Sequence, residues 1–128
     1  MKVHHIGYLV KNISKSIDAF SVIGFTISDN PVFDESRKAH ICFMENDGYR
    51  IELIAPAKDS NLYPLLKRFG NAPYHMCYYC SDISETIKNL ESQKFMLILE
   101  PAPAPAIEDR NVAFMINNGT GIIELLEE

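Results

Sequence analysis

Two stretches of the chain, HIGYLVKNISKSI at residues 5–17 and HMCYYCSDISETI at residues 75–87, share one pattern at an offset of 70 residues. In each, a histidine opens an apolar segment, a polar residue follows that segment, and isoleucines then recur four residues apart. The apolar segment predicts a strand, and the four-residue recurrence predicts one face of a helix. The chain therefore contains two similar modules, each of which begins with a strand and a helix.

The similarity continues beyond the helices. Residues 43–48 align with residues 114–119 at an offset of 71, and one inserted residue then aligns residues 51–53 with residues 123–125. The sequence predicts three further strands in each module. In the first they lie around residues 25–28, 40–45 and 49–54, and in the second around residues 95–99, 111–116 and 121–126. We therefore expect an α+β fold of two tandem βαβββ modules, which form a cup-shaped mixed sheet with helices on its outer face.

Polar and glycine residues mark the ends of these elements. Asn12 and Asp82 precede the two helices as N-caps, and Gly24 follows the first helix in the position of a left-handed turn, where the second module has Lys94. We divide a single domain into module one (1–56), a linker helix within residues 57–73 that ends at Gly70, and module two (74–128). The alternating prolines of residues 101–105 predict an extended loop.

Composition and charge exclude several classes of protein. Of 128 residues, 47% are apolar and 23% are charged, which is typical of a folded globular domain and excludes disorder and coiled coils. No apolar run reaches the roughly 20 residues that span a bilayer, so we expect no membrane contact. The net charge of −5 and the lack of a basic stripe argue against nucleic acid. No secretory leader precedes the first strand, so we expect a cytoplasmic protein.

The three cysteines do not predict a metal or redox motif. Cys77 and Cys80 have the spacing of such a motif, but they lie in a predicted strand, where side chains three residues apart point to opposite faces. Together with Cys42 they form an odd set in a chain without a secretory signal. We therefore interpret all three as structural. The short basic pairs at residues 37–38 and 67–68 are interpreted as solvated surface charge.

Two histidines and two glutamates become equivalent through the repeat: His5 with His75 on the first strand of each module, and Glu52 with Glu124 on the last. Strand alternation places all four opposite to the face that packs under the helices. A mid-strand glutamate is costly unless it is exposed, paired or bound to a cation. The alternative is four surface polar residues, but their register across the repeat favours a site for one divalent ion such as Mn, Co, Ni or Zn.

At this point the sequence resembles the vicinal oxygen chelate superfamily, which includes glyoxalase I, methylmalonyl-CoA epimerase, extradiol dioxygenases and drug-resistance proteins. The resemblance covers the whole chain and rests on residues 5–13, 49–56, 73–78 and 121–126. It implies paired βαβββ modules around a divalent metal held by His5, Glu52, His75 and Glu124. Residues 100–114 and the linker helix are similar to the epimerases, whereas the order His, Glu, His, Glu is that of glyoxalase I.

Both branches move a proton next to a carbonyl, which implies a metal-dependent isomerase or lyase acting on a thioester or hemithioacetal. Glu124 is the first candidate for the carboxylate that carries the proton, and Glu52 is the second. The epimerase branch also implies a carboxylate before the third strand, at Glu35, with Asp34 or Ser36 as alternative registers. A non-catalytic small-molecule binding protein on the same scaffold is the other alternative. The resemblance also implies a homodimer.

Overall fold

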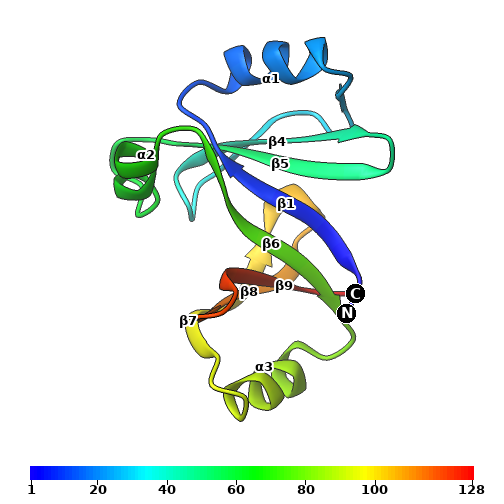
Figure 1. The fold of residues 1–128 in the computed structure, drawn as a ribbon, viewed down its shortest axis with the longest axis vertical. Helices are drawn as coiled ribbons and strands as arrows, with labels where there is room; N and C mark the ends of the chain where they lie inside the picture. Colours follow the sequence, from blue (N-terminus) through cyan, green and yellow to red (C-terminus); the bar gives the residue numbers. More distant parts are fainter. The chain divides into compact units, whose positions relative to one another are not determined.

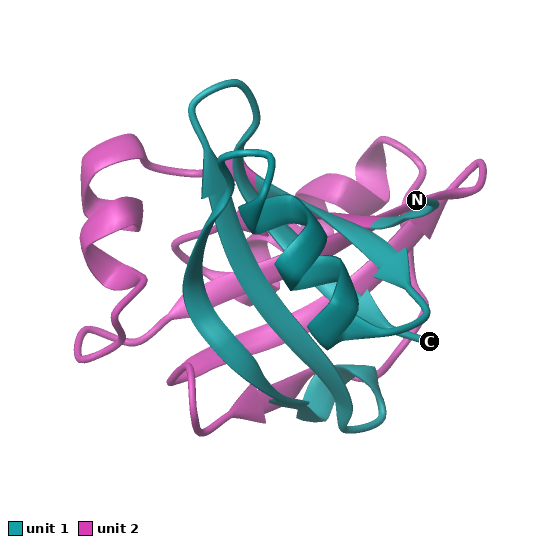
Figure 2. Ribbon diagram, turned by 90° about the horizontal axis from the view of Figure 1, so that it is seen from below, with its two compact units in different colours: residues 1–4, 75–128 teal, residues 5–74 magenta.

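The computed structural model describes residues 1–128 and contains nine strands, three α-helices and one short 3-10 helix. The chain divides into two compact units (Figure 2). Unit 1 comprises residues 1–4 and 75–128, and unit 2 comprises residues 5–74. Because each unit has parallel and antiparallel strand pairs together with a helix, the expected α+β class with tandem βαβββ modules is confirmed.

Unit 2 contains the first module and the linker helix (Figure 1). Its strands run in the order β2-β4-β5-β1, with β3 also paired to β4, and only the β1–β5 pair is parallel. Helix α1 lies over β4 and β5, as Figure 1 shows. The elements are β1 (Val3–Leu9), α1 (Ile13–Val22), β2 (Thr26–Ile27), β3 (Val32–Asp34), β4 (Ala39–Asn46), β5 (Tyr49–Pro56) and α2 (Tyr63–Phe69).

Unit 1 repeats this arrangement with the strand order β6-β9-β8-β7, in which only β6–β9 is parallel. Both chain ends bind the end of β6: the Tyr79 N–H donates to the Lys2 carbonyl at 2.8 Å, and the Glu128 N–H donates to the Cys80 carbonyl at 2.9 Å. The elements are β6 (Ala72–Cys80), α3 (Ile83–Glu91), β7 (Met96–Ala104), the 3-10 helix η1 (Pro105–Ile107), β8 (Arg110–Asn117) and β9 (Gly121–Glu127).

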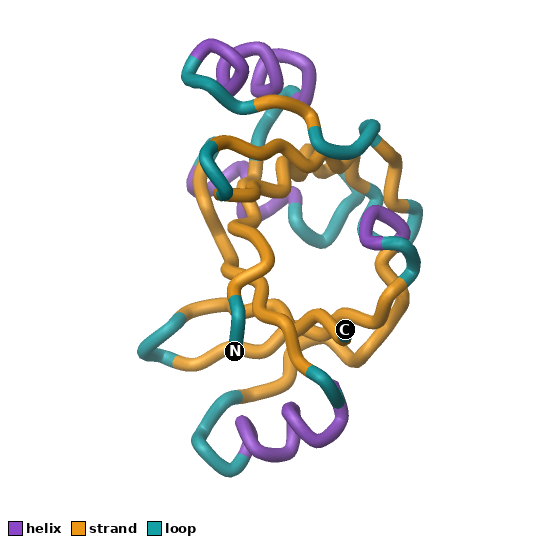
Figure 3. Tube along the Cα trace, turned by 90° about the vertical axis from the view of Figure 1, so that its right-hand side faces the viewer, coloured by secondary structure: helices purple, strands orange, loops and turns teal.

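Each unit has its own apolar core between its helix and its strands, so that α1 and α3 each cover one face of the strands of their unit (Figure 3). The helical residues with four-residue spacing supply the contacts to the strands. The core of unit 2 contains Val10, Cys42, Met44, Ile51, Leu53 and Ala55, and the core of unit 1 contains Ile83 and Ile87 of α3 together with Cys80, Ala113, Met115, Ile123 and Leu125. The last strand of each module thus turns alternate residues towards its helix.

The predicted helix ends are confirmed. The side chains of Asn12 and Asp82 accept hydrogen bonds from the Lys15 and Glu85 N–H groups at 3.0 and 2.9 Å. Gly24 has a φ of 109° and its counterpart Lys94 a φ of 70°, so both modules make the same left-handed turn. The second module therefore accepts a backbone conformation that is unfavourable for a residue with a Cβ atom.

Two expectations need correction. Residues 101–104 are extended, as their prolines predict, but they belong to strand β7 and not to a loop; Pro103 pairs with Asn111 of β8. The strand accommodates prolines because it is at the end of the strand order and its register shifts before Ala102. The short strand β3, which pairs with the start of β4, was not expected from the repeat.

None of the helices has the length and apolar character that crossing a membrane requires.

Candidate metal centre

Unit 2 brings together two of the four candidate metal ligands. His5 Nε2 lies 3.3 Å from Glu52 Oε1, and both side chains are buried. The parallel pairing of β1 and β5 explains this contact, because it places Gly7 beside Glu52 and therefore puts His5, two residues earlier, on the same face as the glutamate. Since Gly7 has no side chain, the glutamate can extend along β1 towards the imidazole.

Unit 1 contains the second pair in the corresponding position. His75 Nε2 lies 2.8 Å from Glu124 Oε2, again with both side chains buried. The parallel strands β6 and β9 place the small residue Cys77 beside Glu124, as Gly7 is placed beside Glu52. The two units therefore share the strand register, the ring nitrogen that faces the carboxylate, and a small residue beside the glutamate on the neighbouring strand.

A phenylalanine fixes each histidine ring from the neighbouring antiparallel strand. Phe43 pairs with Glu52 across β4 and β5, and its ring meets that of His5 edge to face at 5.1 Å. Phe114 pairs with Glu124 across β8 and β9, and its ring meets that of His75 at 5.3 Å. These contacts hold the imidazoles in one orientation, which a preorganised ligand requires.

The donor atoms of each pair have the spacing of two ligands on one metal ion. Two atoms that are each about 2.1 Å from an ion and at right angles to each other lie about 3.0 Å apart. The observed distances of 3.3 Å and 2.8 Å fall on either side of this value. Each pair offers one imidazole nitrogen and one carboxylate oxygen, a set that suits Mn, Co, Ni or Zn. The donor atoms of each pair, taken by itself, are therefore compatible with a divalent ion.

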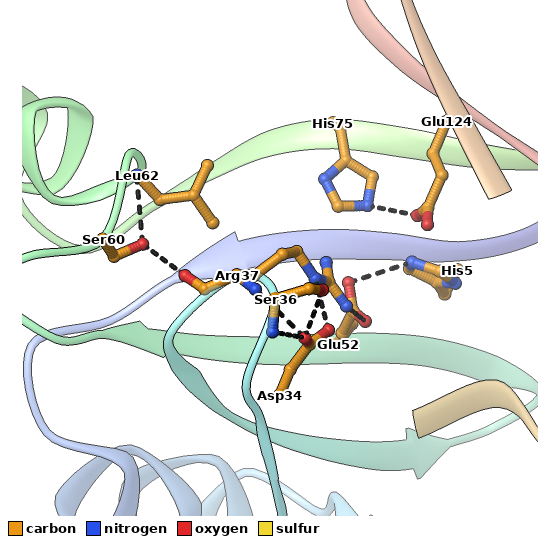
Figure 4. A network of polar contacts seen from close by, with 9 residues as sticks. All are labelled: His5, Asp34, Ser36, Arg37, Glu52, Ser60, Leu62, His75 and Glu124. Carbon is orange, nitrogen blue, oxygen red and sulfur yellow. Dashed lines mark hydrogen bonds and ion pairs between the residues drawn. The ribbon is translucent and has the colours of Figure 1, made fainter. Parts of the chain in front are cut away.

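Glu52 has a further partner in a polar network of unit 2 (Figure 4). Arg37 Nη2 lies 3.5 Å from Glu52 Oε2, and Arg37 Nε donates to Asp34 Oδ2 at 2.8 Å. Asp34 Oδ1 also accepts from the Ser36 hydroxyl at 2.7 Å, the Ser36 N–H at 3.0 Å and the Arg37 N–H at 3.1 Å. One carboxylate thus orders both the turn after β3 and the guanidinium group that reaches Glu52.

Burial alone raises the pKa of the Asp34 carboxyl, but the side-chain hydrogen bonds from Arg37 and Ser36, together with the charge of Arg37, outweigh it and lower the pKa below its ordinary value of 3.8. Asp34 is therefore ionised at neutral pH and balances the charge of Arg37. The loop before α2 adds a second anchor, because the Ser60 hydroxyl donates to the Arg37 carbonyl at 2.6 Å. Arg37 is thus held through both its backbone and its guanidinium group.

Glu35 and the other two histidines of the chain are not members of these pairs. Glu35 is exposed in the turn between Asp34 and Ser36. His4 packs against Tyr79 with ring centroids 5.0 Å apart, and the exposed His40 packs against Phe33 at 4.9 Å. The sequence reasoning missed Arg37, which it interpreted as solvated charge. The signal that identifies it is the order Asp-x-Ser-Arg, in which an aspartate closes a turn on its own following residues.

Comparisons with known proteins identify the family and the fold. Residues 4–114 match the model of the Glyoxalase/Bleomycin resistance protein/Dioxygenase superfamily. The chain is 25% identical over 130 residues to the uncharacterized protein YqjC of Bacillus subtilis (strain 168), covering 98% of this chain and 91% of that protein.

Two solved structures show the same fold. A hypothetical protein from Bacillus halodurans C-125 has a TM-score of 0.88 at 22% identity, covering 99% of this chain and 94% of that one. Methylmalonyl-CoA epimerase from Mycobacterium tuberculosis has a TM-score of 0.84 at 21% identity, covering 98% of this chain and 86% of that one. The chain belongs to the Glyoxalase/Bleomycin resistance protein/Dioxygenase superfamily. This superfamily includes enzymes, among them epimerases.

Proposed function

We propose that the chain is a divalent-metal-dependent enzyme that moves a proton at the carbon next to a carbonyl group. The observation that supports this proposal is the repeated, buried pair of histidine and glutamate, 3.3 Å apart in unit 2 and 2.8 Å apart in unit 1. We propose that His5, Glu52, His75 and Glu124 together hold one ion of Co, Ni, Mn or Zn. Two carboxylates and two neutral imidazoles neutralise a divalent cation, which offsets the cost of burying the glutamates.

The four residues have distinct roles in this proposal. When bound, the ion would act as a Lewis acid and stabilise negative charge on the carbonyl oxygen of the substrate. Glu124 takes the proton from the adjacent carbon at one of its carboxylate oxygens, and Glu52 is the second candidate for this role. In a lyase-type isomerisation the same carboxylate would return the proton, whereas in an epimerase a second group would deliver a proton to the opposite face. The exposed Glu35 is the candidate for a second base on the opposite side of the substrate, as inversion at that carbon requires two groups.

The substrate that we propose first is a CoA thioester such as methylmalonyl-CoA, because an epimerase of that substrate shares the fold over 98% of this chain. A hemithioacetal, as in glyoxalase-type lyases, is the second candidate. The hemithioacetal is favoured by Glu52, because this residue gives unit 2 the same histidine–glutamate pair that unit 1 has. We further propose a cytoplasmic homodimer.

The decisive experiment is proton NMR of methylmalonyl-CoA in heavy water with metal-loaded and metal-stripped protein. Loss of the α-proton signal, faster than spontaneous exchange and dependent on the metal, supports the epimerase. If no acceleration occurs, the same preparations are assayed with the hemithioacetal of glutathione and methylglyoxal. If both substrates are inert and the chain instead binds an aromatic drug tightly without retaining metal, a binding protein is the better description.

A mixing experiment determines whether the four residues come from one chain or from two chains of a dimer. His5→Ala and His75→Ala variants are prepared separately, mixed, unfolded and refolded together. Recovery of metal binding in the mixture, to about a quarter of the wild-type sites per chain, indicates a site shared between chains. Absence of recovery indicates a site within one chain. Both variants refolded alone are the controls.

A further inference from the structure

Arg37 touches one of the proposed metal ligands from outside the metal set. Its Nη2 atom lies 3.5 Å from Glu52 Oε2, whereas the other oxygen of the same carboxylate faces His5 Nε2 at 3.3 Å. The carboxylate is thus held at one oxygen by a cation and directed with the other towards the histidine. The side chain of Arg37 is 12% exposed and that of Glu52 is fully buried, so the contact lies where electrostatic interactions are strong.

Asp34 fixes the guanidinium group in this position. Arg37 Nε donates to Asp34 Oδ2 at 2.8 Å, which is the length of a charge-assisted hydrogen bond. Four ionisable side chains therefore lie in a row, in the order Asp34, Arg37, Glu52 and His5, and each contacts the next. The planar fork of arginine allows one nitrogen to hold Asp34 while another reaches Glu52, which a lysine cannot do.

The second module has no counterpart of this row at the corresponding position. At the offset of 71 residues that aligns Phe43 with Phe114, Arg37 aligns with Glu108, which is exposed. The same fold is therefore built without an arginine at this position. The contact of an arginine with the glutamate of the pair is therefore specific to the first module.

We propose that Asp34 and Arg37 are positioning residues for Glu52, which bind its Oε2 atom and leave Oε1 as the oxygen available to the metal. Glu52 is then a ligand through one oxygen only, which keeps one more coordination position free for substrate. Because Asp34 balances the charge of Arg37, the row carries the same net charge as Glu52 alone and still favours a divalent cation. This inference rests on the proposed metal site.

The test uses Co²⁺, whose binding is measured by calorimetry and whose visible spectrum reports the ligand set. The variants are Arg37→Lys, Arg37→Gln and the double variant Asp34→Asn/Arg37→Gln, which retains the net charge of the wild type. Lys38→Gln is the matched control, because Lys38 follows Arg37 directly and pairs with Asp59 on the surface, 3.0 Å away. Thermal melts confirm that each variant is folded.

We expect a Kd for Co²⁺ that is about tenfold higher in Arg37→Lys and in the double variant, because loss of a group that orients a ligand costs 10–100-fold in affinity. The visible spectrum of the Co²⁺ complex should change in both, and Lys38→Gln should retain the wild-type Kd and spectrum. If the double variant matches the wild type in both measurements, only the charge of the row matters and the positioning role is wrong.

The same data separate this inference from the proposed function. If the wild-type chain itself binds no Co²⁺, the metal site and the inference fail together. If the wild type binds Co²⁺ and Arg37→Lys and the double variant bind it equally well with the same spectrum, the metal site stands and only the inference fails. If the double variant does not fold, Arg37→Lys, which keeps Asp34 and the positive charge, decides between these outcomes.

Discussion

His75 Nε2 and Glu124 Oε2 lie 2.8 Å apart on the parallel strands β6 and β9, and both side chains are inaccessible to solvent. A buried carboxylate in this position needs a compensating positive charge, which a protonated imidazole or a bound cation can supply. The pair of His5 and Glu52 repeats the arrangement on β1 and β5. The functional predictions below depend on these two contacts.

Replacement of the glutamate in the second pair should abolish function without unfolding the protein. We expect Glu124→Gln to weaken metal binding by at least tenfold and to lower turnover of the substrate by 10²–10⁴-fold, roughly the range of a lost general base. Calorimetry and the NMR exchange assay measure the two effects. Glu91→Gln, on the surface of α3, is the control; equal activity in the two variants contradicts the assignment of Glu124.

Glu35 offers a way to separate proton transfer from metal binding. It is exposed in the turn after β3, and we expect Glu35→Gln to leave the Kd of the metal unchanged. If Glu35 is the second base, kcat should fall by about 10²–10⁴-fold while the metal content stays the same. Ser36→Ala tests the neighbouring register in the same assay. Full activity in Glu35→Gln excludes a catalytic role for this residue.

Asp34 should make the protein sensitive to acid. The pKa of its carboxyl is lower in the folded chain than the ordinary value of 3.8, so its stabilising effect is complete above that pH and is lost as the pH falls through the folded-state pKa. We expect Asp34→Asn to cost about 2 kcal/mol of unfolding free energy at pH 7, with a smaller difference from the wild type at pH 3. Urea unfolding at both pH values measures this, and a difference that grows in acid contradicts it.

Lys94 has a φ of 70° where the first module has Gly24, so the turn after α3 is a candidate for stabilisation. Relief of the left-handed conformation should contribute about 1 kcal/mol in Lys94→Gly, reduced by the greater freedom of glycine in the unfolded chain. We expect a higher urea midpoint at an unchanged m-value. Lys88→Gly, inside α3, should instead destabilise the chain by about 1 kcal/mol.

The cysteines should be unreactive in the folded protein. Burial raises the pKa of the Cys42 thiol, and the charge of Asp29 adds to this effect. Burial also raises the pKa of the Cys80 thiol. A hydrogen bond with Thr86 opposes this rise, and nearby carboxylates add to it. Because the thiolate is the reactive form, we expect a disulfide reagent at pH 8 to label the native chain slowly and all three cysteines quickly in urea. Rapid labelling of the native chain would show that the cores open readily.

The sequence predicted those features in which local chemistry and the repeat act together. The caps at Asn12 and Asp82 depend on one side chain and the next three residues, and strand alternation is enough to place His5 and Glu52 on one face once the two modules are aligned. The left-handed turn at Gly24 is equally local, with a φ of 109°. These predictions needed no knowledge of which strands are neighbours beyond the order within one module.

The features that the sequence did not predict depend on contacts between distant segments or on position within the sheet. Strand β3 forms only because β4 extends far enough to pair with it, and residues 101–104 are a strand because β8 lies beside them. Arg37 has the sequence context of an exposed basic residue, and only the return of β5 brings Glu52 within 3.5 Å. Such interactions require the tertiary fold to be known.

The prolines of β7 also affect how the protein behaves at high concentration. Met96, Ile98 and Leu99 are 65%, 47% and 46% exposed on a strand at the end of the strand order, which is the kind of edge at which chains aggregate. Pro101 and Pro103 carry no N–H group, so the second half of β7 offers fewer backbone donors to any strand from another chain. The Pro-Ala-Pro segment therefore disfavours the addition of a strand from another chain along this edge.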